Sequence, residues 1–517
     1  MDTLTFDLRI TAGEQSLVDI RRFEIPLNHV TFLFGESGIG KSLISRAIYG
    51  LLDPEEYHIV INGETYDSYL SRPETRAIKE HSFFVFQEPS SHLNPLLPLG
   101  VQLREGSLSQ ASDDAYLLGE LWEGSDATEI QKLLEVYPKP YRPSGGEKQR
   151  MFLVMALKRI DLPREQRRRE TGERGPVSGF PSPVFVFDEP TGSLDNHFRD
   201  VFLRLLFDRF QRQRFTVLLI THDYSMISQV TRSHRNSLDG VSFKELRRHH
   251  GQLEVKDFQA ETYTGWLKKQ EVSVRPSSRT GQSSPLLSVE SGAEVFGHQI
   301  TFSRDPSGKK ACPLEVFPGT MVYLKAPSGE GKTTVMKIMM GLIRAGHLRM
   351  NINGTDITER ARRRYWQQRM WGKQMTMVFQ HADEALNPRS RVKEIFRGLP
   401  TRQKMTTEVI RQKLKELFDA ELSDDFLDTR VSSLSGGQKQ RLNLLRGLVL
   451  DTEIVLLDEP LNGLDFESTT RVLSLLEEKQ QSGRGILLVS HNEEIVSTVV
   501  TEENTYYLHS AKVHAPA

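Results

Sequence analysis

The sequence predicts an α/β fold built twice along the chain, each copy with a mainly parallel sheet at its core. Three observations predict it: apolar runs typical of strands buried on both faces, glycine-rich loops between a strand and a helix, and the return of both in the same order. The 517 residues are too many for a single hydrophobic core and suit two domains of about 250 residues each.

The first expected strand, His29–Phe34, runs into a glycine loop that is followed by a helix at Leu43–Leu52. The same order returns at Met321–Leu324 and Thr334–Ile343. A strand, a glycine loop and a helix in this order form the P-loop arrangement. The further buried strands that continuous apolar runs predict are Val184–Phe187, Val217–Ile220, Ile454–Leu457 and Ile486–Val489.

Matching motifs align the two copies. GESGIGKS at Gly35–Ser42 returns as APSGEGKT at Ala326–Thr333, and SGGEKQR at Ser144–Arg150 returns as SGGQKQR at Ser435–Arg441. The loop lysines are 291 residues apart (332 − 41), but the aspartates of the two DEP motifs are only 270 apart (458 − 188). The first copy therefore carries about 21 extra residues between its SGG motif and its DEP motif.

The extra residues fall at about 161–183, a stretch with four prolines and three glycines. We expect a solvated loop there, with a partner-docking loop as the alternative. Residues 271–287 are rich in serine, arginine and proline and are interpreted as a flexible linker. The expected domains are therefore 1–270 and 288–517.

Composition narrows the class of protein. A formal net charge of −1 gives no global attraction to nucleic acid or anionic membrane. The single cysteine, Cys312, excludes an internal disulfide and a cysteine-based zinc or iron–sulfur site within one chain. No apolar run approaches the roughly 18 residues of a spanning helix, and no secretory signal pattern opens the sequence. We expect a cytoplasmic location, or a peripheral one on the cytoplasmic face of a membrane whose spans another subunit supplies.

The glycine loops carry the strongest functional signal, because their backbone N–H groups and the following helix end suit a phosphate. Lys41 and Lys332 can reach the phosphates of ATP, and Ser42 and Thr333 can offer a hydroxyl to Mg²⁺. Ala326 replaces the first glycine, so that turn must avoid positive φ. The predicted phosphate-binding residues are Gly35, Ser37, Gly38, Gly40, Lys41, Ser42, Ser328, Gly329, Gly331, Lys332 and Thr333.

Acidic pairs end two of the expected strands. Asp188 and Asp458 are suited to the Mg²⁺ shell, and Glu189 and Glu459 to polarising an attacking water. Phosphoryl transfer needs mainly positioning and charge stabilisation, which a carboxylate aimed at water supplies. The alternative is an acidic pair that merely caps a strand end.

Histidines and SGG motifs repeat at matching positions. His222 and His491 follow apolar strands and are candidates to contact the γ-phosphate. Ser144 and Ser435, each followed by two glycines, predict a capping box at a helix start, which is also an anion site.

Together these motifs resemble the ATP-binding-cassette ATPases over nearly the whole chain. The resemblance implies an antiparallel β part and a helical subdomain beside each parallel sheet. It also implies head-to-tail pairing of the two halves, with ATP between the glycine loop of one half and the SGG helix of the other. One implied site joins Lys41, Ser42, Gln87, Asp188, Glu189 and His222 to Ser435, Gly436, Gly437 and Gln438. The other joins Lys332, Thr333, Gln380, Asp458, Glu459 and His491 to Ser144, Gly145, Gly146 and Glu147.

The resemblance assigns further roles. The implied Mg²⁺ ligands are Ser42, Gln87, Asp188, Thr333, Gln380 and Asp458, and the implied D-loop aspartates are Asp195 and Asp465. Phe302 is the candidate for stacking on adenine in the second half, and the first half offers no clear equivalent beyond Phe6. Because Pro143, Glu147 and Ala326 depart from the family pattern, we predict that the second site is the slower one.

The segments FQEPSSHLNP and FQHADEALNP resemble the peptide/nickel importer branch, in which this segment contacts the membrane permease. That branch often carries a cysteine-bearing C-terminal extension, which is not found in the 26 residues after His491 (517 − 491). The leading interpretation is the energising subunit of such an importer. The alternative is a soluble ATP-driven factor that remodels or activates a metalloenzyme or another protein complex, as in the methyl-coenzyme M reductase activation component and the carbon–phosphorus lyase accessory ATPases.

A third class, nucleic-acid binding, depends on one stretch. Arg360–Trp371 interleaves five arginines with three aromatic residues, a composition compatible with a phosphate-binding, stacking surface. The balanced net charge argues against it, and we interpret the stretch as a solvated edge before the Gln380 strand.

Overall fold

The computed structural model describes residues 3–94, 96–104, 111–122, 127–135, 144–161, 183–192, 196–249, 252–273, 284–327, 329–418, 422–423 and 425–513. The chain divides into two compact units, the first made mainly of residues up to Tyr263 and the second mainly of residues from Thr264. In the described part of the chain, no helix has both the length and the apolar character needed to cross a membrane.

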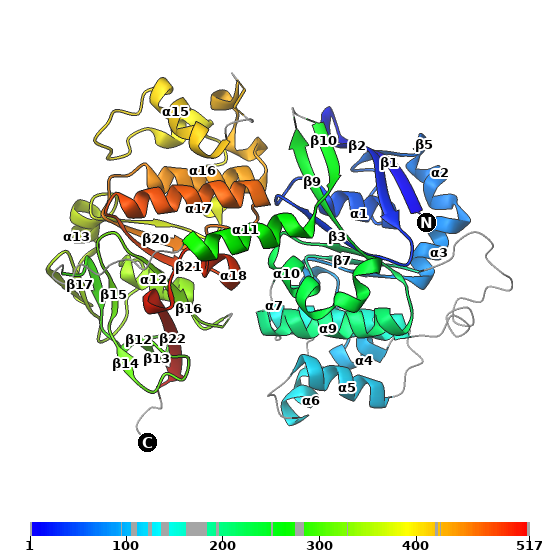
Figure 1. Ribbon diagram of the computed structural model, residues 1–517, viewed down its shortest axis with the longest axis horizontal. Helices are drawn as coiled ribbons and strands as arrows, with labels where there is room; N and C mark the ends of the chain where they lie inside the picture. The colour runs from blue at the N-terminus through cyan, green and yellow to red at the C-terminus, as the bar shows by residue number, and fades with distance from the viewer. Residues whose placement is uncertain are drawn as a thin grey trace. The chain divides into compact units, whose positions relative to one another are not determined.

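A six-stranded sheet forms the centre of the first unit. Its strands, in spatial order, are β10 (Gln252–Asp257), β9 (Val241–His249), β3 (Val30–Gly35), β8 (Thr216–Ile220), β7 (Val184–Asp188) and β6 (Phe83–Val85). Neighbouring strands from β9 to β6 are parallel, and β10 is antiparallel to β9. Every residue of β3, β7 and β8 is buried, as expected for strands covered on both faces. Figure 1 shows α1 on one side of this sheet and α9 on the other.

Helices cover the sheet and form a separate helical part between β6 and β7. The covering helices are α1 (Lys41–Tyr49), α7 (Gly145–Asp161), α9 (Asn196–Arg212) and α10 (Ser225–Ser233). The helical part holds η1 (Pro89–Ser91), α4 (Leu99–Arg104), α5 (Ala111–Leu121) and α6 (Ala127–Glu135). The turn η2 (Arg235–Gly240) follows α10, and α11 (Ala260–Ser273) follows the last strand.

An antiparallel sheet lies beside the parallel one in the first unit. Its strands are β2 (Gln15–Pro26), β1 (Thr3–Ala12), β4 (His58–Ile61) and β5 (Glu64–Thr65), followed by helices α2 (Tyr66–Ser71) and α3 (Pro73–His81). Alternate residues of β1 are buried, so one face of this sheet packs on the core. A single hydrophobic cluster joins both sheets to α1.

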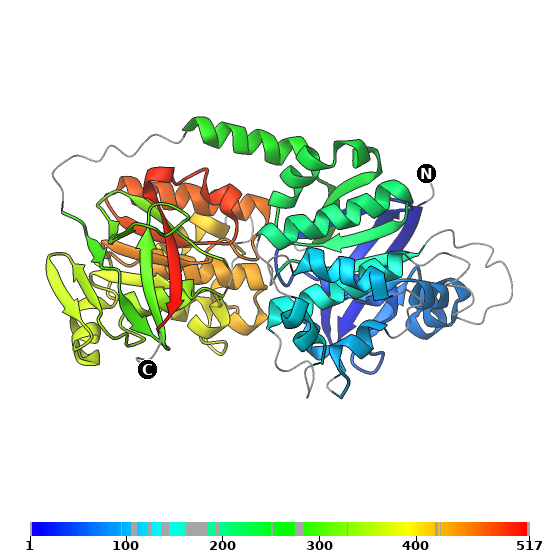
Figure 2. The same cartoon turned by 90° about the horizontal axis from the view of Figure 1, so that it is seen from below.

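The second unit repeats this architecture. Its main sheet orders β12 (Ala293–Val295), β13 (His298–Ser303), β22 (Thr505–Lys512), β16 (Met321–Lys325), β21 (Gly485–Val489), β20 (Ile454–Asp458) and β19 (Met375–Val378), with β14 (Ala311–Cys312) beside β13. Strands β22 to β19 are parallel to one another. Figure 2 shows β13 and β22 as neighbouring green and red arrows, although they come from opposite ends of this unit. The antiparallel sheet orders β15 (Leu314–Val316), β11 (Leu287–Val289), β17 (Arg349–Ile352) and β18 (Thr355–Thr358).

The helices of the second unit follow the same plan. They are α12 (Lys332–Met339), α13 (Arg363–Tyr365), the π-helical turn η3 (Trp366–Met370), α14 (Ala382–Ala385), η4 (Val392–Phe396), α15 (Thr407–Phe418), η6 (Phe426–Asp428), η7 (Val431–Ser433), α16 (Gly436–Leu448), α17 (Phe466–Gln481), α18 (Glu493–Val496) and η8 (Glu502–Asn504). The predicted fold class, with its antiparallel and helical parts, is confirmed in both units.

Element limits differ from the predictions at a few places. Helix α1 starts at Lys41 and ends at Tyr49, because Gly50 takes φ 77° and stops it before the predicted Leu52. The predicted linker 271–287 overlaps two elements at its ends. Helix α11 continues to Ser273, and strand β11 begins at Leu287. Residues 274–283 of that linker and 162–182 of the predicted insertion lie outside the described residues.

Candidate functional site

The first glycine loop joins β3 to α1 in the first unit. Gly40 is the N-cap of α1, with φ 116° and no side-chain cap, so the first N–H groups of the helix remain open to a ligand. Lys41 is only 5% exposed, and its Nζ donates to the carbonyl oxygen of Gly35 over 2.6 Å. The lysine charge is thereby held inside the loop, next to the uncapped helix end.

The second unit builds the same arrangement from β16 and α12. Gly331 caps α12 with φ 87° and again without a side-chain hydrogen bond. Lys332 is 7% exposed, and its Nζ donates to the carbonyl oxygens of Ala326 and Pro327 over 2.6 and 3.0 Å. Ala326 is therefore compatible with the loop, since its backbone carbonyl accepts as that of Gly35 does. Thr333 follows in the first turn of α12, and Ser328 lies outside the described residues.

A buried aspartate ends the strand beside each loop. Asp188 is fully buried, and its Oδ1 accepts a hydrogen bond from Ser42 Oγ over 2.9 Å. Burial raises the pKa of Asp188 to about 6, although the Ser42 hydrogen bond opposes this rise. Asp458 is 1% exposed, and burial likewise raises its pKa.

The surroundings of these two aspartates show whether each site suits a Mg²⁺ ion. Among the described residues, Oδ2 of Asp188 and both carboxylate oxygens of Asp458 are buried without a hydrogen-bond partner, an arrangement that a cation would satisfy. In the described part of the chain, no cluster of three or more His, Cys, Asp or Glu could hold a metal ion by itself. Mg²⁺ bound through one or two carboxylates plus substrate phosphates needs no such cluster. The residues therefore fit Mg²⁺ bound together with ATP.

Glu189 and Glu459 share a strained backbone. They take φ of 48° and 50°, a left-handed conformation that is uncommon outside glycine. The N–H of Glu189 donates to Ile220 over 3.0 Å, and that of Glu459 donates to Val489 over 2.9 Å. Gln440 also donates to the carbonyl oxygen of Glu459 over 3.2 Å. The neighbouring strand thus holds each glutamate at the carboxyl end of the sheet.

The histidines contact these glutamates differently in the two units. Nδ1 of His222 lies 2.9 Å from Oε1 of Glu189, within hydrogen-bonding distance. In the second unit, Nε2 of His491 lies 3.4 Å from Oε1 of Glu459, and the backbone N–H of His491 donates to Oε2 over 3.0 Å. Oε1 of Glu459 is buried without a hydrogen-bond partner.

The pKa values of the two glutamates are therefore shifted in opposite directions. Burial by itself would raise the pKa of Glu189, but His222 and Lys41 outweigh it and hold that pKa below its usual value. Burial also disfavours the charged form of His222, yet Glu189 raises the pKa of His222 overall. At Glu459 the effect of burial is the largest and raises the pKa to about 7, although the backbone N–H of His491 and the charge of Lys332 both lower it. The surroundings thus favour the charged form of Glu189 and disfavour that of Glu459.

The SGG motifs begin helices α7 and α16 and form the expected capping boxes. The backbone N–H of Ser144 donates to Glu147 over 2.6 Å, and that of Glu147 donates back to Ser144 Oγ over 3.2 Å. Ser435 and Gln438 make the same reciprocal pair at 3.0 and 3.1 Å. Gly145, Gly146, Gly436 and Gly437 occupy the first turns of these helices.

The same helices hold the backbone just before the predicted glutamines. Gln149 of α7 donates to the carbonyl oxygen of Phe86 over 3.4 Å, and Asn443 of α16 donates to that of Phe379 over 3.0 Å. Gln87 is exposed and Gln380 half-buried, and in the part of the chain that the structure describes neither donates to the aspartates. Gln149 and Gln440 were not among the predicted site residues, although their matching place in both SGGxKQ motifs was an available signal.

The adenine-stacking prediction for Phe302 is wrong in this structure. Phe302 is 2% exposed and belongs to the hydrophobic core, because the alternation of β13 turns it inward beside Ile300. Phe6 is likewise a core residue, 6% exposed. Neither ring has a face open to a base. Asp465 is the N-cap of α17 and accepts from Ser468 over 2.7 Å, while Asp195 lies outside the described residues.

A family model described as "ABC transporter" matches residues 18–159 and 310–462, which contain both glycine loops and both SGG motifs. The chain is 26% identical over 533 residues to "Uncharacterized ABC transporter ATP-binding protein YejF" of Escherichia coli, covering 96% of this chain and 91% of that protein. It is 32% identical over 200 residues to "Nickel import ATP-binding protein LarO" of Lactiplantibacillus plantarum, covering 38% of this chain and 80% of that protein. The solved structure "RNase-L Inhibitor" shares the fold at a TM-score of 0.59 and 18% identity, covering 97% of this chain and 89% of the other.

Proposed function

Because the chain belongs to the ABC transporter family, with an ATP-binding and ATP-hydrolysing domain in each half, we propose that it is the energising subunit of a membrane importer of the peptide or nickel type. Each unit would bind ATP at its glycine loop. Mg²⁺ would be held by Ser42 and Asp188 in the first unit and by Thr333 and Asp458 in the second, with Gln87 and Gln380 as further ligands. The bound ion would neutralise charge on the phosphates during transfer.

One observation carries the ATPase part of this proposal: each unit brings a buried lysine, a buried aspartate and a strained glutamate to the same end of a parallel sheet. A ligand at that end would meet uncapped helix N–H groups, a lysine charge and a carboxylate able to orient water. The glutamate–histidine pairs would then serve as the groups that position the attacking water.

The importer part is supported by the relatives and by one exposed segment. An E. coli relative that matches nearly the whole chain is described as an ABC transporter ATP-binding protein, and a partial relative is described as a nickel import protein. In the first unit, the segment after Gln87 carries Leu96 at 77% exposed, with Val101 of α4 at 39%. Exposed apolar side chains at this position suit a contact with a permease subunit at the cytoplasmic face of a membrane.

Affinity purification of the full chain from native cells in mild detergent tests the importer role. We expect integral membrane subunits to copurify, and Leu96→Asp to remove them while ATP binding is retained. The double variant Glu189→Gln, Glu459→Gln is the matched control, because it should retain the membrane partners but lose ATP turnover. A stable complex with a soluble enzyme instead would contradict the importer role, favour the remodelling or activation factor, and leave the ATPase assignment unchanged.

A further inference from the structure

A strongly basic segment joins β18 to β19 in the second unit. The whole connection, residues 359–374, holds five arginines and one lysine against a single acidic residue, Glu359, and its residues 360–373 are called here the basic segment. The corresponding connection of the first unit, residues 66–82, balances Arg72, Arg76 and Lys79 against Asp67, Glu74 and Glu80. Since the same fold forms with either composition, the fold itself does not require this concentration of charge.

The arginines of the basic segment are available to a partner. Arg362, Arg363 and Arg364 are exposed, and among the described residues no carboxylate lies within ion-pair distance of them. Arg360 has only Glu359, at 4.0 Å, and its side chain is 91% exposed. By contrast, Arg72 of the first unit pairs with Glu64. Guanidinium groups without partners favour the approach of an anion.

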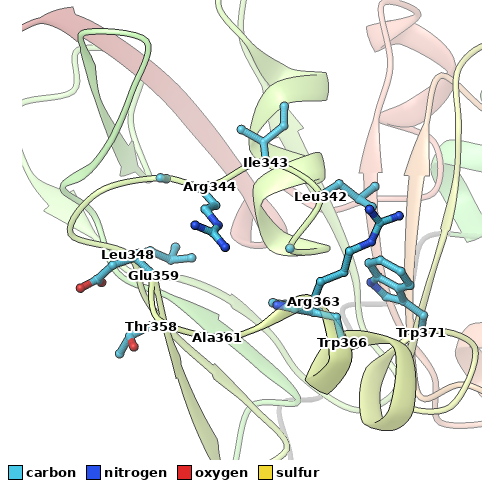
Figure 3. A pocket seen from close by; sticks show the side chains of 12 residues that line it. Leu342, Ile343, Arg344, Leu348, Thr358, Glu359, Ala361, Arg363, Trp366 and Trp371 are labelled. Carbon is cyan, nitrogen blue, oxygen red and sulfur yellow. The ribbon is translucent and has the colours of Figure 1, made fainter.

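A pocket of about 270 Å³ opens beside these arginines. Figure 3 shows Arg363 running past Leu342 and Trp371, with Arg344 pointing into the space. The interior is apolar: Ala345, Leu348 and Trp366 line it and are 2–4% exposed. The pocket thus combines an apolar floor with two guanidinium groups and one carboxylate, that of Glu359. Arg344 and Arg363 have no ion-pair partner among the described residues, so the two positive charges outnumber the negative one.

The pocket wall is fixed to the helix that begins at the second glycine loop. Trp371 Nε1 donates to the carbonyl oxygen of Met340, just after α12, over 2.8 Å. A β-carbon at Gly341 would lie 2.1 Å from the Trp366 ring, so only glycine admits this close packing. The wall also contains the π-helical turn η3, an irregularity often found at functional sites. The pocket is therefore preformed.

The side chains of the basic segment and its pocket favour one class of anionic partner over the others. Trp366 is 3% exposed and offers no open face for stacking the bases of single-stranded nucleic acid. Tyr365 and Trp371 are half-buried, and Trp371 is held against Met340 by its ring N–H. The apolar interior is smaller than a typical pocket for a drug-sized ligand and suits a single bulky side chain. We propose that the basic segment and its pocket dock an acidic peptide segment of a partner protein, one of whose apolar side chains enters the pocket between Arg344 and Arg363.

Fluorescence anisotropy with the full chain tests this proposal. The probe is a labelled seven-residue peptide with a central leucine flanked by aspartate and glutamate. We expect salt-sensitive binding that the double variant Arg363→Glu, Arg364→Glu weakens by at least about tenfold, because the rim charge is reversed. Ala361→Trp, which fills the pocket, should weaken the leucine peptide but not a matched peptide with serine in its place.

Arg76→Glu is the matched control, an exposed arginine in the corresponding connection of the first unit, and should leave peptide binding unchanged. Retained ATP turnover in every variant would show that the fold is intact. Three results would overturn the proposal: no binding of the leucine peptide at millimolar concentration, equal loss with Arg76→Glu, or tighter binding of a homopolymeric single-stranded oligonucleotide or of vesicles rich in anionic lipid than of the peptide.

Discussion

Nδ1 of His222 lies 2.9 Å from Oε1 of Glu189, and this contact helps to hold the pKa of the buried glutamate below its usual value. The corresponding imidazole of His491 stands 3.4 Å from Glu459, whose pKa burial raises to about 7. A general base must be ionised to accept a proton, so the two units are unequally prepared for hydrolysis. The prediction of a slower second site therefore acquires a structural reason beyond the sequence differences.

We expect Glu189→Gln to remove the larger share of ATP turnover and Glu459→Gln the smaller share. Each change should slow hydrolysis in its own unit by about 10²-fold or more, because a glutamine cannot accept the proton. Phosphate release measured for each single variant at neutral pH, with nucleotide binding as the control, checks this. Equal losses of ATP turnover in the two variants would rule out a slower second site.

Asp188→Asn should raise the Mg²⁺ concentration needed for half-maximal turnover by roughly tenfold, because a neutral amide replaces a buried carboxylate with one oxygen lacking a partner. Chelation of divalent ions should stop turnover in the unaltered chain. A Mg²⁺ titration of phosphate release measures both effects. An unchanged Mg²⁺ requirement in this variant would remove Asp188 from the metal shell. Asp67→Asn, which removes an exposed carboxylate on α2, is the control for charge alone.

Asp223→Asn should destabilise the first unit by roughly 2 kcal/mol, because the Arg199 guanidinium, whose side chain is 11% exposed, loses its 2.9 Å contact with Asp223 and keeps the 3.0 Å contact with the more exposed Asp200. Urea unfolding measures the loss. The second unit has Asn492 at the matching position, where it caps α18 instead. Adding Arg199→Met should restore part of the stability, since the mostly buried charge that lost one of its two carboxylate partners is then gone.

This ion pair also predicts a pH dependence. Burial by itself would raise the pKa of Asp223, but Arg199 and Ser225 outweigh it and hold the pKa below its usual value. A lowered pKa in the folded state means that the pair stabilises the fold above the unfolded-state pKa of about 4 and that this stability is lost as pH falls through the folded pKa. The difference in free energy of unfolding between the unaltered chain and Asp223→Asn should have its full value at pH 7 and should become smaller below about pH 4. A difference independent of pH would exclude the ion pair as its cause.

Gly341→Ala should destabilise the second unit by more than about 2 kcal/mol, because the added carbon would meet the Trp366 ring at 2.1 Å and φ is 65°. Gly354→Ala is the matched control, with φ 77° and no atom within 4 Å of the new carbon, and should cost only about 1 kcal/mol. Thermal unfolding of both variants measures the two losses of stability, and the difference between them is the contribution of the steric clash with Trp366. Equal shifts would show that backbone strain alone is responsible.

Much of the candidate site could be predicted because its chemistry is local. A glycine loop needs consecutive residues at a strand–helix junction, so Lys41, Lys332 and their neighbours were recognisable in a single stretch. The acidic pairs and histidines follow apolar runs that form parallel strands, and such strands end at one edge of a sheet. The predictions for Phe302 and Phe6 failed because strand alternation decides which side of a residue faces the core, and the register of β13 and β1 depends on their partners.

By itself, the sequence determined two α/β units, their strands, their glycine loops and the residues suited to phosphate and Mg²⁺, because these features repeat as contiguous patterns. Only the tertiary structure decided the left-handed backbone of Glu189 and Glu459, the closer histidine contact in the first unit, and the pocket beside the basic segment. These depend on distances between residues far apart along the chain, and packing sets such distances. Two nearly identical motifs can therefore enclose glutamates whose pKa values are shifted in opposite directions.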